Sequence, residues 1–255
     1  MDTNLQPNFG SINRQWEALA KTCLDGDSQV RLNTLLDHLK RLPARQAASA
    51  SAEIETAYFL VQAGFSLAFL EATGGRTADL ECYDGIHRFF VEITVIQSTQ
   101  GATRKPVNVG VQPHQLLETE DEFFEQALVK RLLSRMAEKA KQLDRYCAPV
   151  LLAVSVPDLL WGHVRQQEIP PLDLQRLAAL VVGVLPEVPQ FSGVLLTLWK
   201  APAQESRNPI RIRQVSCVTR PSGDASKPRV RLLAVNPLAR YSLTSRELHM
   251  VKKAM

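Results

Sequence analysis

The feature of this sequence that most constrains its fold is a pair of short, almost uninterrupted apolar segments. They read PVLLAVSV at 149–156 and GVLLTLW at 193–199. A strand that is apolar along both faces must be covered on both, as in the interior of a sheet packed between helices. Helical patterns precede these segments, at 121–146 and 172–185. We therefore expect an α/β fold, a three-layer sandwich with a mixed central β-sheet flanked by helices.

Periodicity and turn residues divide the rest of the chain into further elements. Gly64 is placed to end a helix, and the polar residues 98–118 predict a long loop. Helices are expected at 44–63 and 245–254, and strands at 65–72, 77–82, 87–97, 210–218 and 229–235. From residue 44 onward the predicted order is therefore helix, three strands, helix, strand, and then further elements.

The residues before 44 form a helical pattern of their own. Ser11 and Ser28 are suitable N-caps for two successive helices, and Pro43 ends the second. We therefore divide the chain into an N-terminal helical extension, 1–43, and an α/β domain, 44–255. For the extension we expect a contact with a protein partner or with a second copy of the chain in a homodimer.

Composition excludes several classes of protein. No apolar run approaches the ~20 residues of a membrane span, and the first residues have neither the basic start nor the apolar core of a signal peptide. We therefore expect a cytoplasmic protein without membrane contact. The four cysteines include no CxxC pair and the five histidines no HExxH pattern, which argues against a zinc site. A net charge of +4 is compatible with nucleic-acid binding without specifying it.

The segment TADLECYDGIHRFFVEITV at 77–95 carries two acids around a turn. The Asp84–Gly85 pair favours a two-residue type I′ turn, which sets Asp79 opposite Phe90. Asp79 and Glu92 then share one face of the hairpin as diagonal neighbours, with backbones on the order of 7 Å apart. Carboxylates that converge in this way suit a hard divalent cation such as Mg²⁺. The alternative is a solvated hairpin face, and Phe90 on the same face favours a covered one.

This combination resembles the PD-(D/E)xK nuclease-like superfamily, which includes restriction endonucleases and archaeal Holliday-junction resolvases. Its common core is helix, three strands, helix, strand, and the resemblance covers roughly residues 44–156 by element order. The superfamily places a glutamate on the first helix, an aspartate on the second strand and an E-x-K on the third. Glu53, Asp79 and Glu92 match those positions, and Glu55 is an alternative on the helix.

Two departures from the superfamily pattern are visible. Ala78 stands where a proline often precedes the aspartate, and Thr94 stands at the lysine position. Some members carry the lysine on the following helix, so the resemblance implies that Lys139 could reach the site. Gln142 is three residues further on and lies on the same helical face. The alternative for this face of the helix is an ordinary solvated, charged surface.

The resemblance implies a metal-dependent nuclease that hydrolyses phosphodiester bonds, and we expect DNA as its substrate. Mg²⁺ or Mn²⁺ would be bound by Asp79 and Glu92 with help from Glu53, while Lys139 acts on the attacking water or the transition-state charge and Gln142 supports it. The candidates for contacts with the phosphate backbone are Arg104, Lys105, Arg131 and Arg135. Thr94 favours a second hypothesis, an inactive nuclease-like fold that binds nucleic acid or assembles with proteins. A third is an unrelated α/β protein with coincidental acids.

Overall fold

A computed structural model describes residues 9–22, 25–70, 77–97, 120–157, 172–201, 210–221 and 227–255. Within these residues, seven strands form one mixed sheet in the order β1-β2-β3-β4-β5-β7-β6. The strands are β1 Ser66–Phe69, β2 Leu80–Tyr83, β3 Arg88–Val95, β4 Val150–Val156, β5 Gly193–Leu198, β6 Val215–Thr219 and β7 Val230–Val235. The helices are α1 Phe9–Thr22, α2 Gly26–Arg41, α3 Ala44–Gln62, α4 Glu120–Gln142, α5 Leu174–Val184 and α6 Ser245–Ala254, with a short 3₁₀ helix at Leu185–Glu187.

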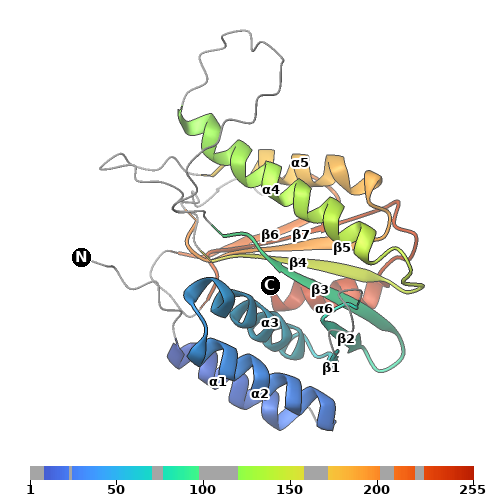
Figure 1. Ribbon diagram of the computed structural model, residues 1–255. Coiled ribbons are helices and arrows are strands. Elements are labelled where there is room, and N and C mark those ends of the chain that lie inside the picture. The colour runs from blue at the N-terminus through green and yellow to red at the C-terminus, as the bar shows by residue number, and fades with distance from the viewer. Residues whose placement is uncertain are drawn as a thin grey trace.

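Helices cover both faces of the sheet (Figure 1). Helices α4 and α5 lie on one face, and their apolar side chains form one hydrophobic cluster with that side of the strands. Helices α1, α2, α3 and α6 lie on the other face and form a second cluster. The expected α/β fold with a mixed sheet between helices is therefore confirmed.

The central strands β3, β4 and β5 run parallel to one another, and every residue of β4 is buried. Leu152 and Val154 of β4 enter the α4–α5 cluster. Leu151 and Ala153, which alternate with them, enter the cluster on the opposite face. Because successive side chains of a strand point to opposite faces, an apolar strand of this kind needs two cores. The uninterrupted apolar pattern of β4 thus has the physical cause that the sequence indicated.

The turn between β2 and β3 differs from the expected two-residue turn. Tyr83 pairs with Arg88, so residues 84–87 form a longer loop and the register is shifted by two residues. The Asp84 side chain is the cause, because its Oδ1 accepts hydrogen bonds from the N–H groups of Ile86 (2.8 Å) and His87 (2.7 Å). A side chain that satisfies the turn's own backbone competes with the tighter turn. A shift of two residues keeps every side chain on its expected face.

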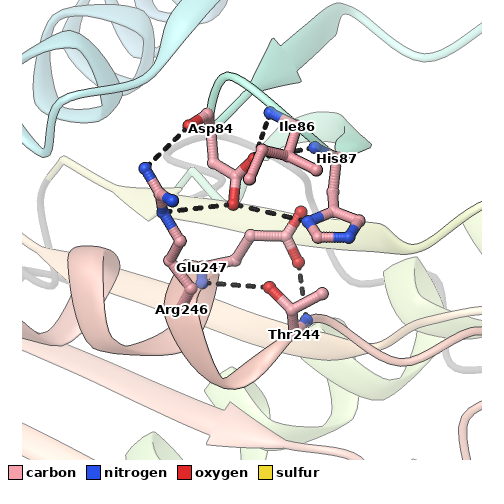
Figure 2. A network of polar contacts seen from close by, with 6 residues as sticks. All are labelled: Asp84, Ile86, His87, Thr244, Arg246 and Glu247. Atoms are coloured by element: carbon pink, nitrogen blue, oxygen red, sulfur yellow. Dashed lines mark hydrogen bonds and ion pairs between the residues drawn. The ribbon is translucent and has the colours of Figure 1, made fainter.

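The same loop is attached to helix α6 (Figure 2). Arg246 of α6 lies 3.5 Å from Asp84 Oδ2 and also donates to the Asp84 backbone carbonyl at 3.2 Å. Glu247 and Thr244 form a capping box that begins α6 at this point. The contact with α6 therefore adds a long-range restraint to a loop whose conformation the Asp84 side chain already favours locally.

Several predicted boundaries and caps are corrected. Helix α1 begins at Phe9, before Ser11, and α4 ends at Gln142 instead of extending to residue 146. Strand β6 begins at Val215, five residues later than expected. The other expected elements appear within a few residues of their predicted bounds, and Gly64 follows α3 with a φ of +96°. The predicted loop at 98–118 lies outside the described residues.

Asp25, rather than Ser28, caps α2, because its side chain accepts a hydrogen bond from the Ser28 N–H. The Ser28 hydroxyl is instead fully buried and accepts a hydrogen bond from the Phe69 N–H of β1 at 2.8 Å. Leu32 and Leu35 of α2 enter the same hydrophobic cluster as Phe69. The N-terminal helices thus share a core with the sheet, while the domain boundary at residue 43 and a partner contact stay predictions.

We predict opposite effects on stability for two glycine substitutions. A Cβ on Gly193 would lie 2.6 Å from the Ala234 backbone carbonyl of β7. Gly193→Ala must push two central strands apart, and we expect a loss of about 1–3 kcal/mol of unfolding free energy. Among the described residues, no atom lies within 4 Å of such a Cβ on Gly183 of α5, and Gly183→Ala should stabilise by up to about 1 kcal/mol. Urea unfolding followed by circular dichroism measures both, and equal stabilities would contradict the strand geometry.

Candidate active site at the start of strand β2

Asp79 lies immediately before β2, at the point where regular pairing between β2 and β3 ends. Its backbone N–H donates to the Val91 carbonyl at 3.0 Å, and its carboxylate Oδ2 accepts the Ile93 N–H at 2.6 Å. The side chain therefore continues the ladder one step beyond the last backbone pair. This bond holds the carboxylate against β3 and favours its charged form. Burial has the larger effect and raises the pKa of Asp79, while Lys139 and Arg31 oppose the rise.

Glu92 lies on β3 next to Asp79. The last regular pair joins Leu80 to Val91, so the two acids are adjacent positions across the strands, closer than the diagonal placement that the sequence predicted. Only 1% of Glu92 is exposed. Burial raises the pKa of Glu92 to about 7, and the negative charge of Asp79 adds to the rise. Its Oε2 atom is buried and has no hydrogen-bond partner within the described ranges.

Helix α4 brings Lys139 onto Glu92. The Lys139 Nζ lies 2.5 Å from Glu92 Oε1 and 3.1 Å from Gln142 Oε1. The position follows from the buried stripe of α4, where Met136 and Ala140 pack on the sheet and Lys139 stands beside them. The structure thus brings together Glu92, Lys139 and Gln142. Helical spacing predicted that Lys139 and Gln142 share a face, and the resemblance implied that Lys139 reaches the acids. Thr94, at the usual lysine position, is buried on the same strand.

Glu53 approaches the same acids from α3, on the opposite face of the sheet. Its Oε2 lies 2.8 Å from Arg31 Nη2 of helix α2. Burial and the charge of Asp79 raise the pKa of Glu53 to about 7, and Arg31 opposes the rise. Glu92 and Glu53 also repel each other, which contributes to the raised pKa of Glu92. The three acids of the candidate motif therefore form one electrostatic cluster.

Sequence reasoning missed two residues of this site, Arg31 and Tyr146. The Tyr146 hydroxyl accepts the Ala78 N–H at 2.6 Å, and its ring packs edge-on against Phe90 with centroids 4.8 Å apart. Burial raises the pKa of Tyr146, and the charges of Glu92 and Asp79 add to the rise. Both residues lie far along the chain from the groups they contact, so spacing gave no signal.

Other candidates are placed away from the acid cluster or outside the described residues. Glu55 accepts a hydrogen bond from Ser51, and burial raises the pKa of Glu55 to about 8, against the opposing effects of Ser51 and Arg231. Arg135 pairs with Glu138 of its own helix at 2.7 Å, and Arg131 donates to the Gln97 carbonyl just beyond β3. The two remaining candidates, which lie in the segment that is not described, are Arg104 and Lys105.

Asp79 and Glu92 are the residues of the acid cluster that could hold a metal ion. Among the described residues, no three His, Cys, Asp or Glu side chains form a ready-made metal cluster. Mg²⁺ does not require one, because it usually keeps several waters and binds one or two carboxylates together with substrate phosphate. Asp79 and Glu92 supply two carboxylates, and Glu92 Oε2, which has no hydrogen-bond partner among the described residues, offers a ligand atom. The residues present therefore fit a hard divalent cation.

Comparison with known protein families, curated proteins and solved structures finds no significant match to this chain. Function must therefore be argued from the site itself. As regards a membrane, none of the helices in the described part of the chain has the length and apolar character needed to span one.

We predict that Lys139→Met destabilises the protein more at high pH than at low pH. The native pKa of Glu92 is about 7 against an ordinary 4.5, so the folded chain holds a proton there that the unfolded chain releases. Glu92 by itself therefore lowers the unfolding free energy as pH rises through that window. Lys139 attracts only the charged form. Its removal should cost about 1–3 kcal/mol near pH 8.5 and little near pH 4.5.

Chemical denaturation across this pH range measures the difference. Lys141→Met is the matched control, because Lys141 is exposed on the same helix and its loss should have the same small effect at every pH. A destabilisation by Lys139→Met that does not change with pH would contradict the contact with Glu92. Carbon-detected NMR of the glutamate carboxyls gives a second measurement, in which the Glu92 pKa should rise in the Lys139→Met variant only.

Proposed function

We propose that this chain is a metal-dependent nuclease that hydrolyses phosphodiester bonds in DNA. The observation that carries the proposal is the contact between Lys139 of α4 and Glu92 of β3, beside Asp79. A buried pair of acids with a lysine against one of them is the chemistry that phosphoryl transfer needs. In the PD-(D/E)xK superfamily the lysine usually follows on the same strand, where this chain has Thr94. Here α4 supplies it.

The order of elements supports the same assignment. Helix α3, strands β1 to β3, helix α4 and strand β4 follow one another in the order of the restriction endonuclease-like core. Glu53, Asp79 and Glu92 come from the first helix and the second and third strands of this order. We include in the proposal a cytoplasmic location and a protein partner or second copy at the N-terminal helices.

The residues of the site divide the work as follows. Asp79 and Glu92 would hold Mg²⁺ or Mn²⁺, with Glu53 beside them. When bound, the cation supplies charge stabilisation to the phosphate and lowers the pKa of a bound water. Lys139 has three N–H donors, and two are engaged by Glu92 and Gln142. Its third donor has no partner among the described residues and would orient the attacking water or offset charge on the phosphate. Gln142 fixes the direction of the ammonium group.

An inactive nuclease-like fold is the alternative, and Thr94 is the observation that favours it. A site without the strand lysine would keep an affinity for nucleic acid or protein but no turnover. In that case the ion pair of Lys139 with Glu92 would serve only to neutralise a buried acid. Turnover in the presence of metal separates the two functions.

The test is cleavage of supercoiled, linear and single-stranded DNA with Mg²⁺ or Mn²⁺. Asp79→Asn keeps an acceptor for the Ile93 N–H and removes the charge, and we expect it to lower the rate by on the order of 100-fold or more. Lys139→Ala should lower it to a similar extent. Lys141→Ala, on an exposed position of the same helix, should retain the wild-type rate.

Each outcome has a distinct meaning. Loss of metal-dependent cleavage in both site variants would support the nuclease and the role of the α4 lysine. Loss in Asp79→Asn alone would keep the nuclease and exclude Lys139 from the chemistry. Absence of cleavage by the wild-type protein on every substrate, with DNA binding retained, would favour the inactive binding module.

A further inference from the structure

The acid cluster has cations on both sides of the sheet. Lys139 approaches from the α4 face and contacts Glu92. Arg31 approaches from the opposite layer, on α2, and contacts Glu53. Both cations oppose the raised pKa of Asp79, so both lie within electrostatic reach of the central acid. We predicted from the sequence that α2 belongs to a separate N-terminal extension. In the structure, α2 contributes the positive charge of Arg31 to the acid cluster.

The position of Arg31 is fixed by the packing of α2. Ser28, one turn before it, binds the Phe69 N–H of β1 through its buried hydroxyl. Leu32 and Leu35 pack into the core on the same side. Helix α1 braces this turn, because the Trp16 indole donates to the Leu32 carbonyl at 3.2 Å. Packing of α1 and α2 therefore places Arg31 beside Glu53.

The guanidinium has donors left over for a ligand. Within the described residues Arg31 donates from Nη2 to Glu53 Oε2, whereas a guanidinium has five N–H donors in a planar fork. Its side chain is 25% exposed, so it is neither sealed in the core nor free in solvent. Arginine often binds phosphate oxygens with two parallel hydrogen bonds. The single hydrogen bond to Glu53 leaves enough Arg31 donors for such a pair.

Electrostatics gives a reason for a cation here. A polyanion such as DNA must approach three acids, and like charges repel more strongly in a partly buried site than in water. Lys139 is already paired with Glu92 on one face. A second cation on the other face, Arg31, offsets part of the remaining repulsion for a phosphate near the acids.

We propose that Arg31 binds a DNA backbone phosphate at the acid site, so that helices α1 and α2 form one wall of the active site. The proposal rests on the proposed function, since it takes DNA as the substrate. In the free protein Arg31 is held by Glu53, and in the complex it shares its donors between Glu53 and the phosphate. Arg31 is then a substrate-contacting residue that the superfamily motif does not include.

The experiment measures binding separately from turnover, with the full-length chain. A fluorescein-labelled DNA duplex is titrated in Ca²⁺ over a series of KCl concentrations, and cleavage is measured in Mg²⁺. For Arg31→Gln we expect the slope of log K against log salt to fall by about 0.9, the value for one lost phosphate contact. We expect kcat/KM for cleavage to fall by on the order of 100-fold.

Arg41→Gln is the matched control, because Arg41 is on the same helix, 78% exposed, and paired only with Asp37 at the surface among the described residues. It should leave the salt slope and the cleavage rate close to those of the wild type. Arg31→Lys keeps the positive charge but loses the two parallel guanidinium donors, and it should bind DNA more tightly than Arg31→Gln and less tightly than the wild type. Glu53→Gln, which frees Arg31 and removes a negative charge, should bind DNA more tightly than the wild type, and this variant tests the proposal even if Arg31→Gln folds poorly.

The outcomes separate this proposal from the nuclease itself. If the wild type binds DNA and Arg31→Gln is indistinguishable from Arg41→Gln, the role of Arg31 is overturned while the nuclease stands. If the slope falls in Arg31→Gln but no protein cleaves, Arg31 is supported and turnover is not. Wild-type protein that neither binds nor cleaves any DNA overturns both.

Discussion

Glu92 is a carboxylate in the middle of a buried strand, and a carboxylate there needs a proton or a cation beside it. Removing a charge from water costs several kcal/mol unless it is paired, as an order of magnitude. Lys139 supplies the pairing at 2.5 Å, and the apolar stripe of α4 holds it there. The other two acids also have partners. The Ile93 N–H donates a hydrogen bond to the Asp79 carboxylate, and Arg31 forms an ion pair with Glu53.

The three layers of the fold meet at this cluster. Lys139, Gln142 and Tyr146 come from α4 and the turn that follows it, the two central acids from the sheet, and Glu53 with Arg31 from the opposite helices. Packing between layers therefore sets the charge of the site. A change that moves α2 or α4 relative to β3 alters which acids are neutralised, even when no acid is replaced.

The sequence predicted most of the sheet because its strands are long enough to show a pattern. The apolar runs of β4 and β5, the glycine after α3 and the spacing of Lys139 from Gln142 are all local signals. The predicted two-residue turn at 84–85 was wrong because the Asp84 side chain accepts the N–H groups of Ile86 and His87, and Arg246, far along the chain, binds the same carboxylate. Arg31 and Tyr146 were missed because their partners lie 22 and 68 residues away.

The sequence by itself determined the fold class, the faces of β3 and the acids that share them, because side-chain alternation and helical periodicity are properties of a single element. Only the tertiary structure decided which cation meets which acid, how the β2–β3 register closes, and that the N-terminal helices reach the acid cluster. These depend on contacts between elements that are distant in the chain. The energies of these contacts come from burial and from the charges that meet only when the layers pack.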